Sequence, residues 1–208
     1  SDTDWSEKRN VAVFRGALTG CNRPNFAPKI NIYDPTNITS ADCRSIMRCR
    51  LVLTYGQSEF IDAKFVTAKF YTPYGKGMLP ERLDDAVMVG SRMSLEEQLS
   101  CKVLIILDGN DIASGLGWGL MSKSVVFMQR PMYTSWLMQE YLEPWVHYIP
   151  IDHDLMDVEE KMKWVMEHDT EARYIAERGT LWIYDLLFHA DAEKDNDLIQ
   201  TEMAHRYM

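Results

Sequence analysis

Short apolar runs rich in β-branched residues alternate along the chain with segments of helical periodicity, and this alternation constrains the fold more than any other feature. Each run has the length of a strand, and its near-continuous hydrophobicity is typical of a strand covered on both faces. The runs are Val11–Phe14, Leu51–Tyr55, Val103–Leu107, Ser124–Met128 and Val146–Ile151. Strands that alternate with helices predict βαβ units with right-handed crossovers. We therefore expect an α/β fold, a Rossmann-like lobe whose mostly parallel sheet is flanked by helices.

The segments between the runs carry helix signals. Ser40 is placed to cap a helix over Ala41–Cys49, and Ser94 with Glu97 forms a capping box before Leu99. In residues 154–167, apolar side chains recur at helical spacing and make one stripe. The stripe consists of Leu155, Val158, Met162 and Val165.

Three further expectations concern domain organisation. A helix that starts at Asp169 is expected to end at Gly179, and residues 180–208 are expected to hold C-terminal helices at Leu181–Phe188 and Asp197–Tyr207. Residues 70–92, with their glycines and prolines, are predicted to form a long loop, the most mobile part of the chain. With 208 residues and 46% hydrophobic content, residues 1–208 suffice for one domain, which would bury roughly 70% of the unfolded chain's surface.

The net charge and the cysteine content exclude some classes of partner and of scaffold. A net charge of -9 argues against nucleic acid or an anionic membrane as the main partner, because phosphate binding depends on clustered Lys and Arg. The chain has no apolar stretch long enough to span a membrane and no signal peptide at its start, and we expect an upstream lobe to be missing. Its four cysteines lack Cys-x-x-Cys spacing and are expected to be buried, reduced thiols.

The strongest candidate for a binding loop follows the run Val103–Leu107. Residues 108–115 have the sequence Asp-Gly-Asn-Asp-Ile-Ala-Ser-Gly, and a helix is expected over Leu116–Met121. Ligands of open parallel sheets bind beyond the carboxyl ends of the strands. Free backbone N–H groups and the positive end of a helix dipole attract a phosphate there without net positive charge. The alternative is that Gly and Asn only provide a tight turn.

A second loop leaves the first run at residues 14–23. Arg15 and Arg23 are placed to offer guanidinium groups to a diphosphate. For Arg15 the alternative is an ion pair with a carboxylate.

Other motifs are weaker. Asp152-His153-Asp154 and Asp195-Asn196-Asp197 match the D-x-D pattern of some metal sites, but both precede helical segments, where Asp is ordinarily a cap, so no metal site is expected. Residues 115–119 lack the G-x-G-x-x-G spacing of nicotinamide-binding folds. The histidines show no H-E-x-x-H spacing and no G-x-S-x-G elbow is present, so hydrolase chemistry has no support.

Several segments together resemble glycosyltransferase family 90, which includes the protein O-glucosyltransferases and the fungal capsule-associated xylosyltransferases. In the second half they are residues 101–110, Ala113-Ser114, residues 123–127, Trp136, residues 144–151 (Pro-Trp-Val-His-Tyr-Ile-Pro-Ile), Asp154-Leu155 and residues 168–179. Upstream, Phe14–Thr19 with Arg23 is similar to the family's arginine-glycine-serine loop, and Phe60–Phe65 to one of its strands. The resemblance covers nearly the whole chain.

The resemblance implies a GT-B enzyme of two Rossmann-like lobes that transfers glucose or xylose from UDP-glucose or UDP-xylose, with inversion and without a metal, to a hydroxyl of a glycan or glycoprotein acceptor. It also implies a place in the lumen of the secretory pathway. By position, Arg23 would bind the diphosphate, and the two loops would contact the phosphates. The expected donor-binding set is Ala17, Thr19, Arg23, Asp108, Gly109, Asn110, Ala113, Ser114 and Gly115.

The sequence departs from the family pattern at three points. Leu116 stands where the family usually has an arginine, and Ser122 stands where Cys101 would have its disulfide partner, which leaves Cys101 a free thiol. The family's catalytic carboxylate belongs to the amino-terminal lobe, so the general base that an inverting transfer needs is not assigned here. The nearest loop carboxylates are Asp84, Asp85 and Asp111, and each of them fits an ordinary solvated acid better than a catalytic base.

Two alternatives to a glycosyltransferase remain. One is a catalytically silent module that binds a nucleotide-sugar, which would retain UDP affinity without hydrolysis or transfer of the donor. The other is a structural α/β domain without a ligand, for which Arg23→Ala would change only surface charge.

Overall fold

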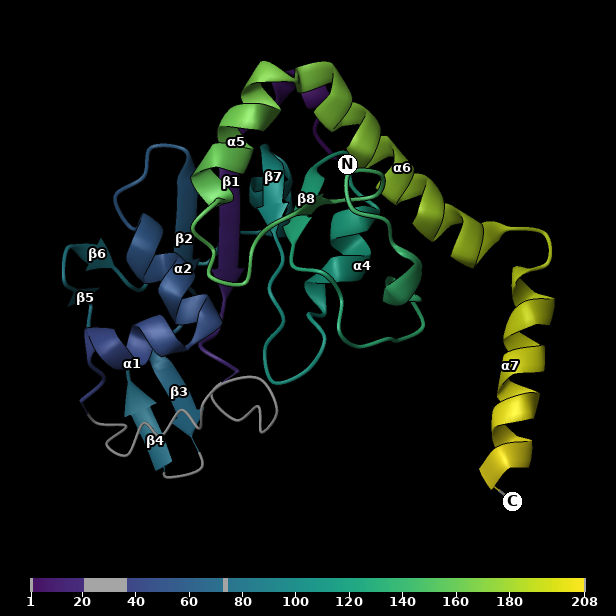
Figure 1. Cartoon of the computed structure of the whole chain (residues 1–208), viewed down its shortest axis with the longest axis horizontal. Coiled ribbons are helices and arrows are strands. Elements are labelled where there is room, and N and C mark those ends of the chain that lie inside the picture. The colour runs from purple at the N-terminus through teal and green to yellow at the C-terminus, as the bar shows by residue number, and fades with distance from the viewer. Residues whose placement is uncertain (1, 21–36, 73–74, 208) are drawn as a thin grey trace.

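A parallel sheet of five strands forms the centre of the molecule (Figure 1). The computed structural model describes residues 2–20, 37–72 and 75–207. The strands run in the order β2-β1-β7-β8-β9, and every neighbouring pair is parallel. Their bounds are β1 Arg9–Gly16, β2 Ile61–Phe65, β7 Cys101–Ile105, β8 Val125–Met128 and β9 Ile149–Pro150. The α/β fold with a parallel sheet flanked by helices is therefore confirmed.

The direction in which successive strands are added to the sheet reverses between β1 and β7, although the two strands are parallel. From β1 the chain moves outward to β2, and it then returns to the other side of β1 and continues through β7, β8 and β9. Val13 of β1 is thus flanked by Asp62 of β2 and by Leu104 of β7. In open α/β sheets, ligands bind at such a reversal, outside the carboxyl ends of the two strands.

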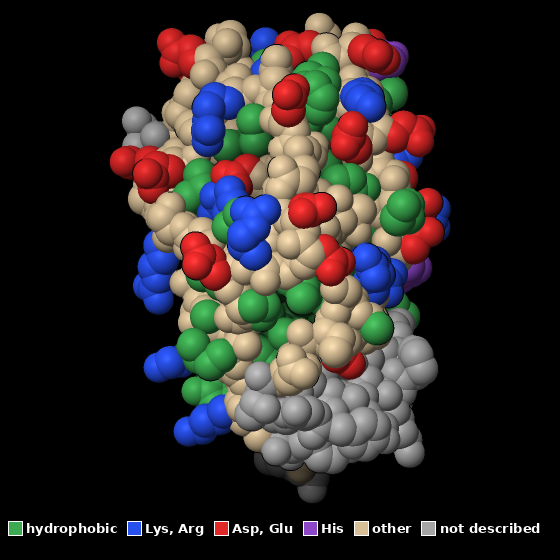
Figure 2. Space-filling model, turned by 90° about the vertical axis from the view of Figure 1, so that its left-hand side faces the viewer, with side chains coloured by type: hydrophobic (Ala, Val, Ile, Leu, Met, Phe, Trp, Pro, Cys, Tyr) green, Lys and Arg blue, Asp and Glu red, His purple; other side chains and the backbone are tan. Residues whose placement is uncertain are grey.

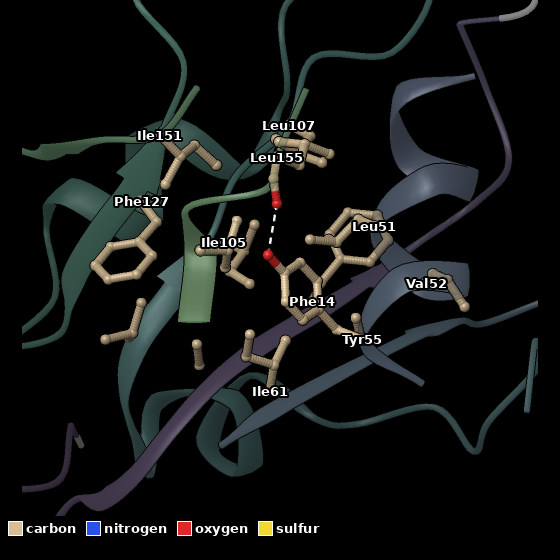
Figure 3. Close-up of a cluster of buried hydrophobic side chains, with 14 of the residues drawn as sticks. Phe14, Leu51, Val52, Tyr55, Ile61, Ile105, Leu107, Phe127, Ile151 and Leu155 are labelled. Carbon is tan, nitrogen blue, oxygen red and sulfur yellow. Dashed lines mark hydrogen bonds between the residues drawn. The ribbon is translucent and has the colours of Figure 1, made fainter. Parts of the chain in front are cut away.

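Alternate strand side chains face two separate layers of helices. Phe14, Ile105 and Phe127 pack in one layer with α2 (Met47–Tyr55), α5 (Val158–Glu167) and the first half of α6 (Asp169–Phe188). In Figure 3 the hydroxyl of Tyr55 on α2 donates a hydrogen bond of 2.6 Å to the carbonyl of Leu155 inside this layer.

The opposite face of the sheet is covered by α3 (Leu95–Leu99) and α4 (Gly115–Leu120). Val13 and Leu104 pack there with Leu99 of α3, and Val126 packs with Leu116 and Leu120 of α4. The predicted capping box of Ser94 and Glu97 is present at the start of α3.

The expected strand Leu51–Tyr55 is wrong, because these residues belong to helix α2. Leu51, Val52 and Tyr55 are buried in the first layer. A short apolar run gives no period that separates a buried strand from the buried face of a helix. The run Val146–Ile151 contains a strand only at Ile149–Pro150.

Helix boundaries also differ from expectation. Thr39, not Ser40, caps α1 (Ser40–Ser45), and it forms a capping box with Asp42, while α2 begins separately at Met47. Of the predicted stripe, Val158, Met162 and Val165 lie buried on α5, whereas Leu155 precedes the helix with a φ of 61°.

Gly179 does not end a helix. α6 continues through it to Phe188, so the expected helix at Leu181–Phe188 is the second half of α6. A Cβ at Gly179 would lie 2.8 Å from the carbonyl oxygen of His147. The glycine is therefore required for close packing against the segment before β9, not for a C-cap.

The segment 70–92, expected as a long loop, contains short antiparallel strands in its described residues. β3 (Lys69–Thr72) pairs with β4 (Gly75–Met78), and β5 (Arg82–Leu83) pairs with β6 (Ala86–Val87). Local hairpins satisfy backbone groups that a loop of this length would leave to solvent.

The expectation of reduced cysteines holds for only one of the three described. Cys43 of α1 and Cys49 of α2 form a disulfide, and both are buried. Cys101 is a buried free thiol, as expected; burial raises its pKa, while the nearby Arg9 guanidinium acts in the opposite direction. Cys21 lies outside the described residues.

Two 3-10 turns and a terminal helix complete the fold. The turns are η1 (Trp5–Glu7) and η2 (Gln139–Tyr141). α7 (Ala192–Tyr207) starts earlier than expected and extends away from the sheet layers (Figure 1). None of its described residues is buried. Within the described ranges, no helix is long and apolar enough to cross a membrane.

Candidate functional site

Two polar loops meet above the strand reversal. The first follows β1 over residues 17–20, and the second follows β7 over residues 106–114. The backbone N–H of Gly20 donates to Asn110 Oδ1 at 2.8 Å. A Cβ at Gly109 would overlap Thr19 Oγ1 and would lie 3.2 Å from the guanidinium carbon of Arg48. The two loops are therefore in direct contact, and only a residue without a side chain fits at position 109.

Arg48 on α2 joins both loops through hydrogen bonds. Its Nη2 donates to the carbonyl of Leu107 at 2.6 Å, and its Nε lies 3.2 Å from the carbonyls of Leu107 and Asp108. Its Nη1 donates to the Ala17 carbonyl at 3.1 Å and to Thr19 Oγ1 at 2.8 Å. One guanidinium thus fixes the first loop, the second loop and α2 relative to one another.

A cavity of about 470 Å³ lies beside these loops. Thr19, Gly20, Asp108 and Gly109 line it, together with side chains that follow β8 and β9. Its lining also includes the apolar side chains Met47, Ile112, Leu116, Met128, Pro131 and Met132, and the polar side chains Arg50, Arg130, Tyr133, Gln139, His153 and Asp154. The volume and the mixed lining are typical of a site for a small organic ligand.

A second cavity of about 280 Å³ lies where β1 and β7 approach α4. Ala17, Ala113, Ser114 and Gly115 line it. Ser114 occupies the N-cap position of α4 but makes no side-chain capping bond, and the N–H of Ala113 is bonded to Asp108 Oδ1 at 3.0 Å.

The expected donor-binding residues that the structure describes thus lie on the two loops after β1 and β7 and at the start of α4. Three of them line the larger cavity (Thr19, Asp108 and Gly109), and four line the smaller one (Ala17, Ala113, Ser114 and Gly115). Asn110 joins the two loops. Arg23, the expected diphosphate ligand, lies outside the described residues. Their roles toward a ligand stay a prediction.

Arg15 lines the smaller cavity, but both terminal nitrogens of its guanidinium are bonded within the sheet. Its Nη2 pairs with Asp62 on the adjacent strand at 2.6 Å, and its side chain is only 6% exposed. Burial alone would raise the pKa of Asp62, but hydrogen bonds from Arg15 and Lys64 outweigh it and lower the pKa. The alternative reading of Arg15, an ion pair with a carboxylate, is the one that holds.

The three carboxylates considered as general base are not among the residues that line the two cavities. Asp84 accepts a hydrogen bond from Ser40 and pairs with Arg44 at 3.3 Å. Neither Asp84, Asp85 nor Asp111 lines either of the two cavities.

The two D-x-D motifs have different surroundings. His153 and Asp154 line the larger cavity, and Asp154 Oδ1 accepts from the N–H of Met156 at 3.0 Å. Asp195 and Asp197 lie within α7 rather than before it. Among the described residues, no three His, Cys, Asp or Glu side chains are grouped so that they could hold a metal ion.

The sequence alone does not predict that three arginines lie at the two loops and the larger cavity. Arg48 and Arg50 fell within a segment divided between an expected helix and an expected strand, so their shared origin on α2 was hidden. Arg130 follows β8 directly, and the rule that ligands bind beyond the carboxyl ends of parallel strands could have identified it.

Sequence comparison relates most of this chain to one protein family. The model of glycosyl transferase family 90 matches residues 1–192. The chain is 32% identical over 91 residues to O-glucosyltransferase LpsA of Dichelobacter nodosus, which is 44% of this chain and 29% of that protein. It is 40% identical over 87 residues to human protein O-glucosyltransferase 3, which is 41% of this chain and 17% of the human protein. The chain therefore matches less than a third of the length of these curated relatives.

Proposed function

Since the chain belongs to glycosyl transferase family 90, we propose that it binds the nucleotide-sugar donor of a glycosyltransferase. The donor is UDP-glucose or UDP-xylose, and the acceptor is a hydroxyl of a glycan or glycoprotein. The names of these two relatives refer to O-glucosyl transfer, which favours glucose as the transferred sugar.

The observation that supports this proposal best is the pair of loops that Arg48 holds together beside the 470 Å³ cavity. The loops stand at the strand reversal where α/β sheets bind nucleotides. In the proposed complex the diphosphate lies against residues 17–20 and 108–115, with Arg23 as a cationic partner. The nucleoside occupies the part of the larger cavity that is lined by Tyr133 and the apolar side chains, which suit a flat base.

The proposed transfer proceeds with inversion and without a metal. The acceptor oxygen forms a bond to the anomeric carbon while the bond from that carbon to the β-phosphate oxygen breaks. The acceptor proton passes to a general base, which we propose lies in another part of the enzyme. The charge that develops on UDP is stabilised by guanidinium groups and backbone N–H donors.

The first test is the thermal unfolding midpoint of the chain with UDP, UDP-glucose, UDP-xylose, GDP-mannose and NAD. Ligand at a hundred times its dissociation constant stabilises a fold by about 2.7 kcal/mol, which for about 200 residues is a shift of several degrees. We expect a shift with uridine ligands only, and a smaller one for Arg23→Ala. A folded sample that shifts with none of the five contradicts the proposal.

The second test separates an enzyme from a silent binding module. UDP release from UDP-glucose and UDP-xylose is measured with and without glycan acceptors. UDP affinity without hydrolysis or transfer, in a protein that also contains the part with the proposed general base, would favour the silent module.

A further inference from the structure

The larger cavity contains two arginines whose charge no carboxylate of the described residues neutralises. Arg50 comes from α2, and Arg130 follows β8. Other cations of this acidic chain do form ion pairs, among them Arg15 with Asp62 and Lys102 with Asp169. Neither Arg50 nor Arg130 has an ion pair within the described residues, so both bring positive charge to the same cavity.

Their hydrogen-bonding capacity is also largely unused. A guanidinium has five N–H donors. Arg50 donates from Nε to the carbonyl of Arg44 at 2.6 Å and from Nη1 to the carbonyl of His153 at 3.3 Å. These bonds hold the side chain in place between α1 and the segment after β9 while leaving further N–H groups for a ligand. The structure records no hydrogen bond of Arg130 within its described part.

Within the described residues, neither acidic side chain of the cavity forms an ion pair with Arg50 or Arg130. Asp108 Oδ1 accepts from the N–H of Ala113 at 3.0 Å, and Asp154 Oδ1 accepts from that of Met156 at 3.0 Å. Each carboxylate is thus bound to the backbone of its own loop. At the start of α4 the cavity lining is Leu116, which brings no charge.

We propose that Arg50 and Arg130 together form an anion subsite that binds the phosphate groups of the donor. Phosphate oxygens accept charge-assisted hydrogen bonds from guanidinium groups, which are about twice as strong as neutral ones. The proposal rests on the proposed function and deepens it, because it assigns the counter-charge of the diphosphate to α2 and to the segment after β8.

The experiment compares UDP with uridine, which lacks the phosphates, by calorimetric titration of the chain. The variants are Arg50→Gln, Arg130→Gln and the double variant. Arg92→Gln is the matched control, since Arg92 is an exposed arginine that lines neither cavity. Losing one charge-assisted contact weakens binding by about tenfold or more. We expect that loss for UDP in each single variant, a larger loss in the double variant, and uridine affinity within about twofold throughout.

Folding of every variant is checked by its melting midpoint. Arg130→Gln breaks no hydrogen bond recorded among the described residues, so it remains informative if Arg50→Gln is destabilised. Unchanged UDP affinity in Arg130→Gln and Arg50→Gln, with a wild-type chain that prefers UDP to uridine, overturns the subsite and leaves the proposed function intact. An equal loss for UDP and uridine also overturns it. A folded wild-type chain that does not bind UDP overturns the proposed function and the subsite with it.

Discussion

At the scale of single residues, the site depends on the guanidinium of Arg48 and on the absence of a side chain at Gly109. Arg48 supplies donors to carbonyls of both loops, and Gly109 leaves the space in which Thr19 and Arg48 meet. Buried acceptors that lose their donor cost about 1–3 kcal/mol each. The two residues therefore couple the stability of the fold to the shape of the site.

Replacing Arg48 tests this coupling. In Arg48→Met the carbonyls of Ala17, Leu107 and Asp108 lose their shared donor, so we expect the free energy of unfolding to fall by about 3 kcal/mol and UDP affinity to fall with it. Urea unfolding and UDP titration measure the two effects. The control is Arg44→Met, which breaks only an exposed ion pair with Asp84 and should cost less than about 1 kcal/mol. Equal effects of the two substitutions would contradict the role given to Arg48.

The contact at Gly109 can be tested by a double-mutant cycle. A Cβ at position 109 overlaps Thr19 Oγ1, so Gly109→Ala is expected to destabilise the fold by about 1–3 kcal/mol. Thr19→Ala removes the overlapping atom, and the double variant should recover part of the loss. Gly115→Ala is the matched control, because its Cβ would meet its nearest atoms at 3.4 Å. Strict additivity in melting experiments would show that the overlap is relieved elsewhere.

At the scale of elements, two neighbouring strands share a partly buried charge network. Arg15 of β1 donates to the carbonyl and to the carboxylate of Asp62 on β2, and Lys64 donates to the same carboxylate at 2.9 Å. The network lies beside the loop that leaves β1. Because Arg15 is nearly buried, its charge depends on the ionised form of Asp62.

This network predicts a pH dependence. The pKa of Asp62 is lower in the folded chain than the ordinary value near 3.9. Its ionised form thus stabilises the fold above about pH 4, and the contribution is lost as the pH falls through the lowered pKa. We expect Asp62→Asn to be less stable than wild type at pH 7, and the difference to shrink toward pH 3. Urea unfolding at both pH values measures it, and a difference that does not change with pH would exclude the network as its cause.

The disulfide between α1 and α2 gives a second prediction for elements. Cys43 and Cys49 are six residues apart, and closing so short a loop stabilises a fold by about 2 kcal/mol in the chain-entropy account. We expect a reductant to lower the melting midpoint of the wild-type chain. The variant Cys43→Ala/Cys49→Ala should melt at that lower temperature with or without reductant. A midpoint that is the same in all four samples would argue that the bond contributes nothing.

How far the sequence predicts this molecule differs between elements. The apolar runs correctly predict β1, β7 and β8, because strands buried on both faces are continuously apolar. Leu51–Tyr55 has the same composition on the buried face of a helix, and no local signal separates the two. The two candidate loops were found because a polar Gly-bearing segment directly follows an apolar run. The sequence does not identify Arg48, Arg50 and Arg130 as site residues, because their roles depend on which loops the fold brings next to them.

At the scale of the whole molecule, the negative charge is distributed over the surface, whereas the positive charge of the site is concentrated in one cavity. Acidic and basic side chains are interspersed over the face seen in Figure 2. A net charge of -9 therefore does not conflict with an anionic ligand, because Arg50 and Arg130 bring two positive charges to the lining of one cavity.

The last prediction concerns how much of the chain the fold requires. α7 has no buried residue among those described, whereas α6 buries Ala172, Ile175, Ala176 and Ile183. Stability follows buried apolar contacts, so a chain that ends at Asp191 should keep a free energy of unfolding within about 1 kcal/mol of the full chain and a melting midpoint within about 4 °C. It should also bind UDP with unchanged affinity.

The comparison for this truncation is a chain that ends at Glu167, which loses α6 and should not fold, since burying one such apolar side chain contributes about 1.5–3 kcal/mol. Circular dichroism and thermal melting follow both chains. If removal of residues 192–208 lowered the midpoint by ten degrees or more, α7 would have to pack against the sheet layers in solution, and its exposed side chains Leu198, Ile199 and Met203 would be the surface that does so.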